Sequence, residues 1–341
     1  MIVTVTLDPA LHVQYQAERI AWGSSNPVRR VRHRAGGRGL AVARTLQRFG
    51  HEVVAAGLAG GTAGELLRSQ LAAAGVATQF TRIAMESRRV TEIADGSRRV
   101  TTTFSEPAPY ITTEELGRLA ADYRSLLDGA SAAVLCGGLP AGLPAETYAS
   151  LASYAAEAGV PVVLDAGGEV LRHALGRRPA LVIPEDTGPA DPAALVAAGA
   201  AAAAVVSGEE VLVATRDGCW QAGLPHPVQA DRPGQPAAET WPAAGLPPPY
   251  VAAPAGAGRS GAGQAGPAPG LVSAGSWRDA LVAGFVPGVV LGWSWPESLA
   301  HAVAMAAAAG QDGEIDLDRY EARLAAVRVR ETGVCSTDRR C

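Results

Sequence analysis

The chain has 341 residues, of which 48% are hydrophobic and 18% charged, and its formal net charge is −4. This length and composition are ordinary for a globular protein of one or two domains. The acidic balance argues against nucleic acid as the main partner. No apolar run reaches about 18 uninterrupted residues, so we expect no membrane span. Residues 1–7 lack the basic start of a signal peptide, and we therefore expect a cytoplasmic protein.

The chain contains no lysine, and all 29 basic residues are arginine. This excludes a P-loop lysine, a Schiff-base lysine and a lysine general base. The cysteines show no paired spacing of the kind that holds a metal, so we expect free thiols in a reducing compartment. They are Cys136, Cys219, Cys335 and Cys341.

The N-terminal part of the chain predicts a strand followed by a small β flap. Residues 2–7 alternate like a strand and lead into Asp8-Pro9-Ala10-Leu11-His12. Residues 12–20 and 28–34 are β-like runs with charges on both sides, which suits an exposed flap better than a core sheet. A further β-rich stretch at 87–105 is expected to complete this flap.

A strand–helix alternation begins after residue 52 and predicts a mostly parallel sheet with helices on both faces. The expected strands are 53–59, 132–138, 161–166, 180–184, 203–207 and 210–215. The expected helices are 40–49, 62–74, 113–128, 145–158, 168–177, 192–199, 279–292, 296–309 and 316–327, with capping boxes at Thr112-x-x-Glu115 and Ser294-x-x-Glu297. Ligands collect at the carboxyl ends of such strands. Asp8, Gly137-Gly138, Asp165, Glu185 and Ser207-Gly208 fall at these ends.

Two helix starts have features of an anion site. Gly36-Gly37-Arg38-Gly39 opens the helix 40–49, where glycines permit close approach of the backbone, although a plain tight turn explains them equally well. A second turn enters an apolar helix that carries Asp279 in its first turn. A phosphate bound at that helix end would lie beside a carboxylate able to position an attacking hydroxyl. Ser276-x-x-Asp279 also fits a capping box, in which the acid serves only the helix itself.

The domain organisation follows from these elements and from two segments without them. Residues 229–272 are rich in Pro, Gly and Ala and have no periodicity, which predicts a mobile low-complexity insertion. We expect one domain over residues 1–329, with lid strands at about 12–34 and 87–105, followed by a polar tail at 330–341.

Taken together, the motifs resemble the PfkB carbohydrate kinases of the ribokinase-like fold, in the 1-phosphofructokinase and tagatose-6-phosphate kinase branch. The resemblance covers about residues 1–228 and 273–329. Its motifs are Asp8-Pro9-Ala10-Leu11-His12, Gly36-Gly37-Arg38-Gly39-Leu40-Ala41, Glu86-Ser87-Arg88, Gly137-Gly138-Leu139-Pro140, Asp279-Ala280-Leu281-Val282-Ala283-Gly284-Phe285 and Gly313-Glu314-Ile315-Asp316-Leu317. It implies a three-layer α/β fold with a mostly parallel sheet, helices on both faces and a small β lid.

The resemblance also implies a function: an ATP-dependent phosphotransferase that uses Mg²⁺ and acts on a hydroxyl of a sugar, sugar phosphate or sugar-like acceptor. Asp279 takes the position of the family's general base, and Glu185 is expected near the magnesium ion. The expected substrate-binding residues are His12, Gly36, Gly37, Arg38, Arg88 and Gly138. The expected ATP-binding residues are Ser207, Gly208, Gly275, Ser276 and Arg278. The uncovered flap edges allow a homodimer.

The chain departs from the family pattern at several of these positions. Ser276-Trp277-Arg278 replaces Gly-Ala-Gly before the base, and Glu185-Asp186-Thr187-Gly188 replaces Asn-x-x-Glu. His12 and Ala41 replace the Asp and Asn that contact the sugar. A site with different hydroxyl contacts should reject the usual sugar. A kinase for a cyclitol or nucleoside, and a catalytically impaired relative that binds a ligand or partner, therefore stand as alternatives.

Overall fold

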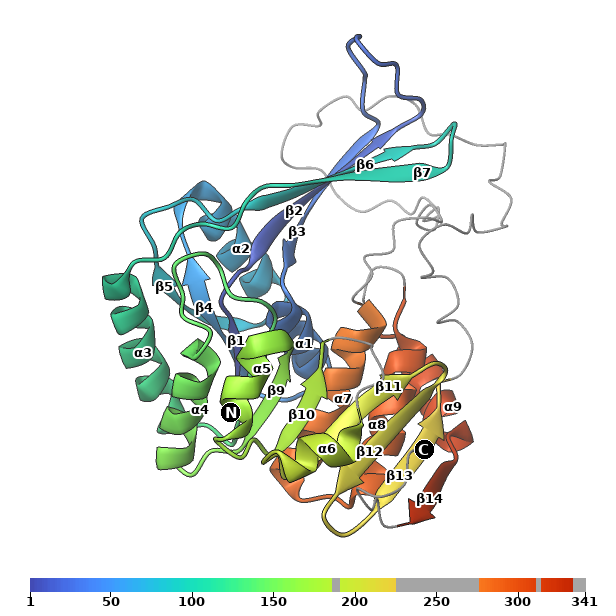
Figure 1. Cartoon of the computed structure of the whole chain (residues 1–341). Helices are drawn as coiled ribbons and strands as arrows, with labels where there is room; N and C mark the ends of the chain where they lie inside the picture. Colours follow the sequence, from blue (N-terminus) through green and yellow to red (C-terminus); the bar gives the residue numbers. More distant parts are fainter. Residues whose placement is uncertain (186–190, 225–275, 311–313, 334–341) are drawn as a thin grey trace.

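The computed structural model describes residues 1–185, 191–224, 276–310 and 314–333 (Figure 1). Within these residues the main sheet has the strand order β14-β13-β12-β11-β10-β9-β8-β1-β4-β5. Neighbouring strands run parallel from β11 to β5, and the β12 to β14 edge is antiparallel. The strands are β1 (Ile2–Thr6), β4 (Val53–Ala59), β5 (Ala77–Arg82), β8 (Ala132–Cys136), β9 (Val162–Ala166), β10 (Leu181–Pro184), β11 (Ala202–Ser207), β12 (Glu210–Thr215), β13 (Cys219–Gly223) and β14 (Val329–Gly333).

Helices cover both faces of this sheet and give three layers (Figure 1). They are α1 (Arg38–Arg48), α2 (Gly61–Ala73), α3 (Thr113–Leu127), α4 (Thr147–Glu157), α5 (Gly168–Leu175), α6 (Pro192–Ala197), α7 (Ser276–Leu291), α8 (Trp295–Ala308) and α9 (Leu317–Ala326). One core joins α1, α2, α7 and α8 to the sheet, and a second joins α3, α4 and α5 to its other face. The predicted fold class is confirmed.

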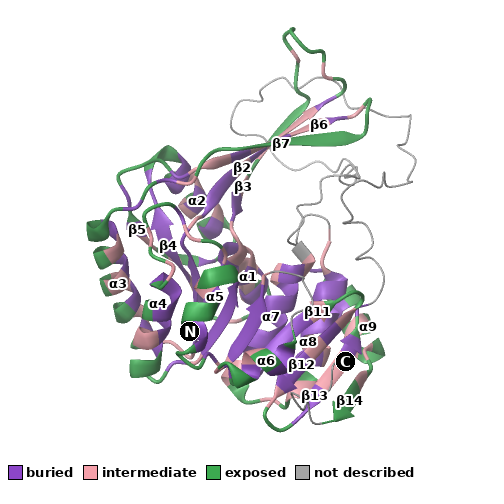
Figure 2. Cartoon of the chain, viewed as in Figure 1, coloured by how far each residue is buried: buried purple, intermediate pink, exposed green. Residues whose placement is uncertain are grey.

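The central strands are apolar on both sides because both faces are covered. Every residue of β1, β8, β9 and β10 is buried, including Thr4 and Thr6 of β1 (Figure 2). These strands therefore read as continuous apolar runs rather than alternating ones. Both predicted capping boxes form, at Thr112–Glu115 before α3 and Ser294–Glu297 before α8.

A second sheet projects from the main body as a lid (Figure 1). Its strands are β2 (Ala10–Ala17), β3 (Arg30–Gly36), β6 (Arg89–Asp95) and β7 (Val100–Ser105), in the order β3-β2-β6-β7. The predicted flap, completed by a segment within 87–105, is confirmed. Leu11, Val13 and Ala35 of one face belong to the core, and the opposite face of the same strands is polar. The outer lid is exposed, and all six residues of β7 are open to solvent (Figure 2).

Some expectations differ from the structure. The short strands β5 and β13 lack clean alternation and were not predicted, and β14 extends the sheet into the segment expected as a polar tail. Cys219 is disulfide-bonded, so the expectation of free thiols is wrong for that residue, whereas Cys136 is free and buried. The predicted insertion at 229–272 lies outside the described residues. None of the described helices is both long and apolar enough to cross a bilayer.

Close packing of α7 on α8 depends on Gly284. A Cβ atom there would lie 2.5 Å from Ala302 Cα and 3.0 Å from Ala302 N. We expect Gly284→Ala to lower the free energy of unfolding by about 1–3 kcal/mol, because the helices must separate. Gly117→Ala in α3 is the matched control, since no atom lies within 4 Å of the added Cβ. It should stabilise the protein by about 0.5–1 kcal/mol. Urea denaturation measures both, and equal effects would contradict the packing.

Candidate functional site

A cavity of about 320 Å³ lies where the base of the lid meets the carboxyl edge of the main sheet. Strands β10, β9, β8 and β1 are neighbours there. From β1 the chain adds β4 and β5 on one side of that strand, and it then adds β8, β9 and β10 on the other side. The strand order therefore reverses at β1, and ligands of such sheets bind where the order reverses. The cavity is lined by Thr6, Asp8, Ala10, His12, Arg34, Gly36, Gly37, Arg38, Ala41, Arg44, Arg88, Cys136, Gly137, Gly138, Glu185 and Asp279.

The cavity brings together most of the residues predicted from the sequence. His12, Gly36, Gly37, Arg38, Arg88, Gly138, Glu185 and Asp279 all line it. The structure does not bring Ser207, Gly208 or Arg278 into its lining. Ser207 is exposed, and Gly208 has φ +60° in the turn between β11 and β12. Gly275 lies outside the described residues, and Ser276 is described only as the start of α7.

The glycines before α1 allow three elements to meet. A Cβ atom on Gly36 would lie 2.1 Å from His12 Cδ2, so the His12 ring occupies the space that any side chain there would need. Gly37 has φ +130°, and its Cβ would lie 2.8 Å from Thr6 Cγ2. The first turn of α1, with its free N–H groups, is thereby seated against the end of β1.

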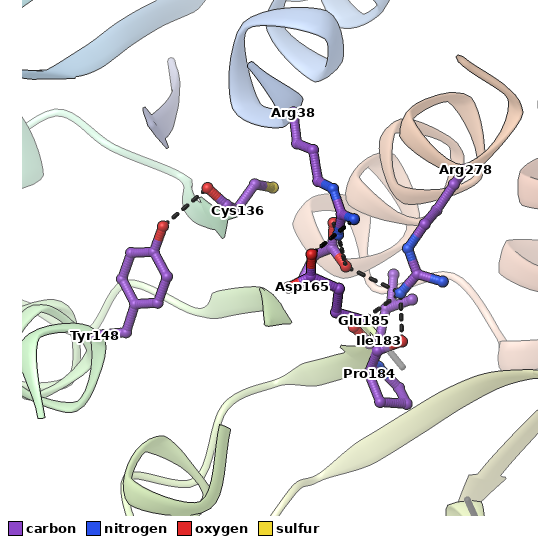
Figure 3. A network of polar contacts seen from close by, with 8 residues as sticks. All are labelled: Arg38, Cys136, Tyr148, Asp165, Ile183, Pro184, Glu185 and Arg278. Carbon is purple, nitrogen blue, oxygen red and sulfur yellow. Dashed lines mark hydrogen bonds and ion pairs between the residues drawn. The ribbon is translucent and has the colours of Figure 1, made fainter. Parts of the chain in front are cut away.

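The most buried charge of the site is Asp165 of β9, whose side chain is fully buried. It lies between Arg38 and Arg278 (Figure 3). Arg278 Nη2 donates to Asp165 Oδ1 at 3.0 Å. Arg38 Nη1 donates to both carboxylate oxygens at 3.3 and 3.2 Å, and Arg38 Nη2 lies 2.9 Å from Glu185 Oε1. Burial lowers the pKa of Arg38, but the charges of Asp165 and Glu185 outweigh burial and leave that pKa raised. These contacts tie α1, α7, β9 and β10 together.

Arg278 faces away from the cavity and into the protein. Its Nη2 group also donates to the carbonyl oxygens of Ile183, at 3.4 Å, and Pro184 (Figure 3). Arg278 stands at the second glycine of the family motif and has no positive φ, so its side chain causes no backbone strain at that position. Trp277 packs against the core and does not line the cavity.

Asp279 is half-buried in the cavity wall on the first turn of α7. Its Oδ1 atom is buried and has no hydrogen-bond partner among the described residues. Desolvation is the largest effect on this carboxyl, and with the nearby charge of Asp165 it raises the pKa of Asp279 to about 8. Arg38, Arg44 and Arg34 act in the opposite direction. A carboxyl in a cavity wall with a pKa of about 8 and an oxygen without a hydrogen-bond partner among the described residues can exchange a proton with a ligand.

At the lid side of the cavity, two acidic residues hold the predicted binding residues. Arg88 Nε donates to Asp8 Oδ1 and Oδ2 at 2.9 and 3.0 Å. His12 Nδ1 lies 3.5 Å from Glu92 Oε1. Arg88 is therefore oriented by Asp8, whereas His12 Nδ1 lies near Glu92 without a hydrogen bond to it among the described residues.

The floor of the cavity is rigid and apolar near the end of β8. The Tyr148 hydroxyl donates to the Cys136 carbonyl oxygen at 2.8 Å (Figure 3). Burial raises the pKa of the Cys136 thiol well above its ordinary value, which leaves the thiol unreactive. No group of three potential metal ligands from His, Cys, Asp and Glu occurs in the described part of the chain.

Sequence reasoning missed several residues of this site. The sequence places Asp165 at the carboxyl end of a strand but gives it no role in the site. That position was the available signal for a role there. Its two arginine partners come from α1 and α7, far along the chain, so no local pattern identifies them. Arg34 and Arg44 belong to a flap and a helix whose arginines suit a solvated surface equally well.

The sheet with this strand order, the β lid and the acid on the first turn of α7 in the cavity wall are the features that the sequence motifs predicted. A family model described as the pfkB family of carbohydrate kinases matches residues 6–191 of the chain. The chain therefore belongs to the PfkB family, as the sequence motifs predicted.

Solved structures share the fold over nearly the whole chain. A Staphylococcus aureus protein provisionally assigned as a phosphofructokinase has a TM-score of 0.75 at 21% identity, covering 98% of this chain and 100% of its own. The tetrameric inhibited form of phosphofructokinase-2 from Escherichia coli has a TM-score of 0.74 at 21% identity, and the match covers 95% of this chain and 98% of that one. A carbohydrate kinase from Agrobacterium tumefaciens has a TM-score of 0.66 at 18% identity, and the match covers 96% of this chain and 99% of that one. At these identities the likeness shows the ribokinase-like fold.

The Asp165–Arg278 pair predicts a specific stability pattern. Arg278→Met should lower the free energy of unfolding by about 3–5 kcal/mol, because it removes a partner from a buried charge. The double variant Asp165→Asn/Arg278→Met should lose less than the sum of the two single changes, because the two groups are coupled. Arg172→Met breaks an exposed pair with Glu169 and should change stability by about 0.5 kcal/mol or less. Additive single changes in chemical denaturation would contradict the coupling.

Proposed function

We propose that the protein is an ATP-dependent phosphotransferase that phosphorylates a hydroxyl group of a sugar phosphate or sugar-like acceptor. The observation that carries this proposal is Asp279, whose Oδ1 atom has no hydrogen-bond partner among the described residues and lies in the cavity wall. Membership of a carbohydrate kinase family supports the reaction class. Two of the similar structures are a protein provisionally assigned as a phosphofructokinase and phosphofructokinase-2, which supports a 1-phosphofructokinase-like hexose kinase.

In this proposal Asp279 acts as the general base. Its carboxylate accepts the proton of the acceptor hydroxyl as that oxygen attacks the γ-phosphate. The free N–H groups at the start of α7 offer positive dipole to the transferring group. Arg38 adds a guanidinium at the same edge, held by Asp165 and Glu185. Positioning and fixed charge then supply most of the catalysis, as phosphoryl transfer requires.

The residues present fit a magnesium–ATP complex in one respect. Mg²⁺ is usually bound by one or two carboxylates together with substrate phosphates and water. Glu185, partly exposed at the end of β10, is the carboxylate that would contact the ion or its water. Bound magnesium would neutralise charge on the phosphates. Ser207, Gly208, Gly275 and Ser276 remain the predicted nucleotide-side residues. Arg278 no longer belongs with them, because it is buried against Asp165 and two backbone carbonyl oxygens.

His12 and Ala41 give the acceptor site an unusual set of groups. Both line the cavity, with the His12 ring packed over Gly36. A kinase acting on a cyclitol or nucleoside is the alternative that these two residues favour. An acceptor panel of hexoses, hexose phosphates, cyclitols and nucleosides, with magnesium-dependent ATP consumption as the readout, tests the proposed function. Turnover with a hexose phosphate alone supports the first proposal.

A catalytically impaired relative is favoured by the arginine at position 278, which is buried against Asp165 and outside the cavity lining. Calorimetry with ATP, with and without Mg²⁺, separates this alternative from the enzyme. Magnesium-dependent binding in the micromolar range counts against it. No detectable binding counts for it.

Asp279→Asn should reduce turnover by a factor on the order of 10² or more, because an amide cannot accept the proton. In the unmodified protein the carboxyl must be ionised to act, so kcat/KM should rise with pH through about 8, the pKa raised by burial and by Asp165. The folding control has the opposite pH trend. Ionisation of a buried carboxyl destabilises the folded state, so the unmodified protein loses stability as pH rises through about 8. The melting temperature of Asp279→Asn relative to that of the unmodified protein should therefore increase from pH 5 to pH 9. Near-wild-type turnover in this variant would remove Asp279 from the mechanism.

We also propose a homodimer formed through the lid. The edge strand β7 is fully exposed and carries Val100 and Phe104, each 53% exposed. Exposed apolar edge strands favour pairing with a second chain. Phe104→Asp should convert a dimer into a monomer by light scattering. Leu291→Asp changes an exposed apolar residue outside the lid and should leave the dimer intact. A monomeric wild-type protein would contradict the proposal.

A further inference from the structure

A carboxylate of the lid lies behind His12, on the side of the ring away from Gly36. Glu92 of β6 is buried and does not line the cavity, whereas His12 of β2 does. Gln14 of β2 is the register partner of Glu92, and its Nε2 atom donates to Glu92 Oε2 at 2.7 Å. The other carboxylate oxygen, Oε1, lies 3.5 Å from His12 Nδ1. Gln14 therefore holds Glu92 in place with one oxygen on the His12 side.

Glu92 is ionised in this setting. Its contact with His12 is the largest influence on the carboxyl and, together with the Gln14 amide and the charge of Arg34, lowers the pKa of Glu92, although burial acts in the opposite direction. Arg34 stands opposite His12 on the neighbouring strand β3, so the lid itself supplies a cation near this carboxylate. An ionised carboxylate carries no proton and can only accept hydrogen bonds.

The position of Glu92 decides which ring nitrogen of His12 carries the proton. Nδ1 is buried and has no hydrogen-bond partner among the described residues, and Glu92 Oε1 is the charged atom near it. If Nδ1 carried no proton, its lone pair would lie near a carboxylate in a region of low dielectric, and two acceptors would repel each other. A proton on Nδ1 turns this repulsion into attraction, even at a distance that is long for a hydrogen bond.

The second ring nitrogen, Nε2, lies on the cavity side of His12. A Cβ atom on Gly36 would lie 2.4 Å from Nε2, so this edge of the ring lies over a glycine, and both residues line the cavity. A neutral imidazole with its proton on Nδ1 has a free lone pair on Nε2 and accepts a hydrogen bond there. The chain thereby keeps a hydrogen-bond acceptor at the position where the family has an aspartate.

We propose that Glu92, held by Gln14, is a positioning residue that keeps the proton of neutral His12 on Nδ1, so that Nε2 accepts a hydrogen bond from a hydroxyl group of the phosphate acceptor. This inference rests on the proposed function and deepens it, because it states what position 12 reads: a hydroxyl donor, recognised by an uncharged ring. An acceptor that lacks this hydroxyl would leave Nε2 without a partner and should be rejected. Glu92 acts through His12, since it does not line the cavity itself.

Nitrogen-15 NMR of the histidine rings, recorded on the ligand-free full chain at alkaline pH, measures the tautomer directly, and a His12→Gln spectrum assigns the resonances. The unmodified protein should show a protonated Nδ1 and a bare Nε2. Glu92→Met removes the carboxylate and should move the proton to Nε2, the tautomer that imidazole prefers in water. Glu18→Met is the matched control, because it removes an exposed acid of the lid that pairs with Arg29, and it should leave the His12 tautomer unchanged.

Kinetics with fructose 1-phosphate as the acceptor probe test the hydroxyl contact. Glu92→Met should raise KM for this acceptor by about fivefold, the size of one neutral hydrogen bond, and should change kcat by less than about twofold, because Asp279 is untouched. Glu18→Met should change neither constant by more than about twofold. A loss of kcat with an unchanged KM in Glu92→Met would contradict the role of His12 in binding.

A thermal melt establishes that each variant is folded. If Glu92→Met does not fold, Gln14→Leu replaces it; this change releases Glu92 Oε2, and the spectrum should then show both tautomers of His12. A bare Nδ1 in the unmodified protein would overturn the proposal, and so would a tautomer that is unchanged in the folded variant. Because the spectra are recorded without ATP, a protonated Nδ1 in a chain that consumes no ATP would leave the positioning of His12 standing and reject the proposed function instead.

Discussion

Asp165 is a fully buried carboxylate held between Arg278 on α7 and Arg38 on α1. A charge buried so deeply is tolerated only with close partners, and losing one is costly. The need for close charged partners around Asp165 holds the starts of α1 and α7 against the ends of β9 and β10. It also places Asp279, the residue after Arg278, in the cavity wall near a second negative charge. Burial is the largest cause of the raised pKa of Asp279, and the charge of Asp165 adds to it.

The same cluster accounts for the departure from the family pattern before Asp279. Trp277 and Arg278 stand where the family has alanine and glycine, and both have ordinary helical backbone. The guanidinium added by Arg278 points inward to Asp165 and two carbonyl oxygens. At the other end of the cavity, Arg88 is paired with Asp8, and His12 Nδ1 lies 3.5 Å from Glu92 Oε1. Arg278 is therefore held by structural partners, and Asp279 Oδ1 keeps no hydrogen-bond partner among the described residues.

Periodicity and capping predicted the sheet, its helical layers and the lid, because strands such as β8 and helices such as α3 are locally consistent. The short strands β5, β13 and β14 escaped prediction because pairing with neighbours, rather than local pattern, makes them strands. Family motifs identified most of the cavity lining, including His12, Arg38 and Asp279. They did not identify Asp165 with its arginines, because those contacts join residues distant in sequence. They did not identify Arg34 and Arg44 either, because neither residue belongs to a recognised motif. The glycines before α1 predicted a tight turn and an anion site equally well. The structure gives a packing reason for Gly36, because the His12 ring occupies the space that a side chain there would need.

The central claim is that the buried Asp165 cluster and the closed environment give Asp279 the proton affinity of a general base. A carbon-13 NMR titration of the aspartate carboxyl resonances, assigned with an Asp279→Asn spectrum, measures that affinity directly. The account predicts a pKa of about 8 for Asp279, raised by burial and by the charge of Asp165. It also predicts a lower pKa for this carboxyl in Asp165→Asn, where the second negative charge is absent. A pKa near the ordinary 3.8 in the unmodified protein would contradict the account.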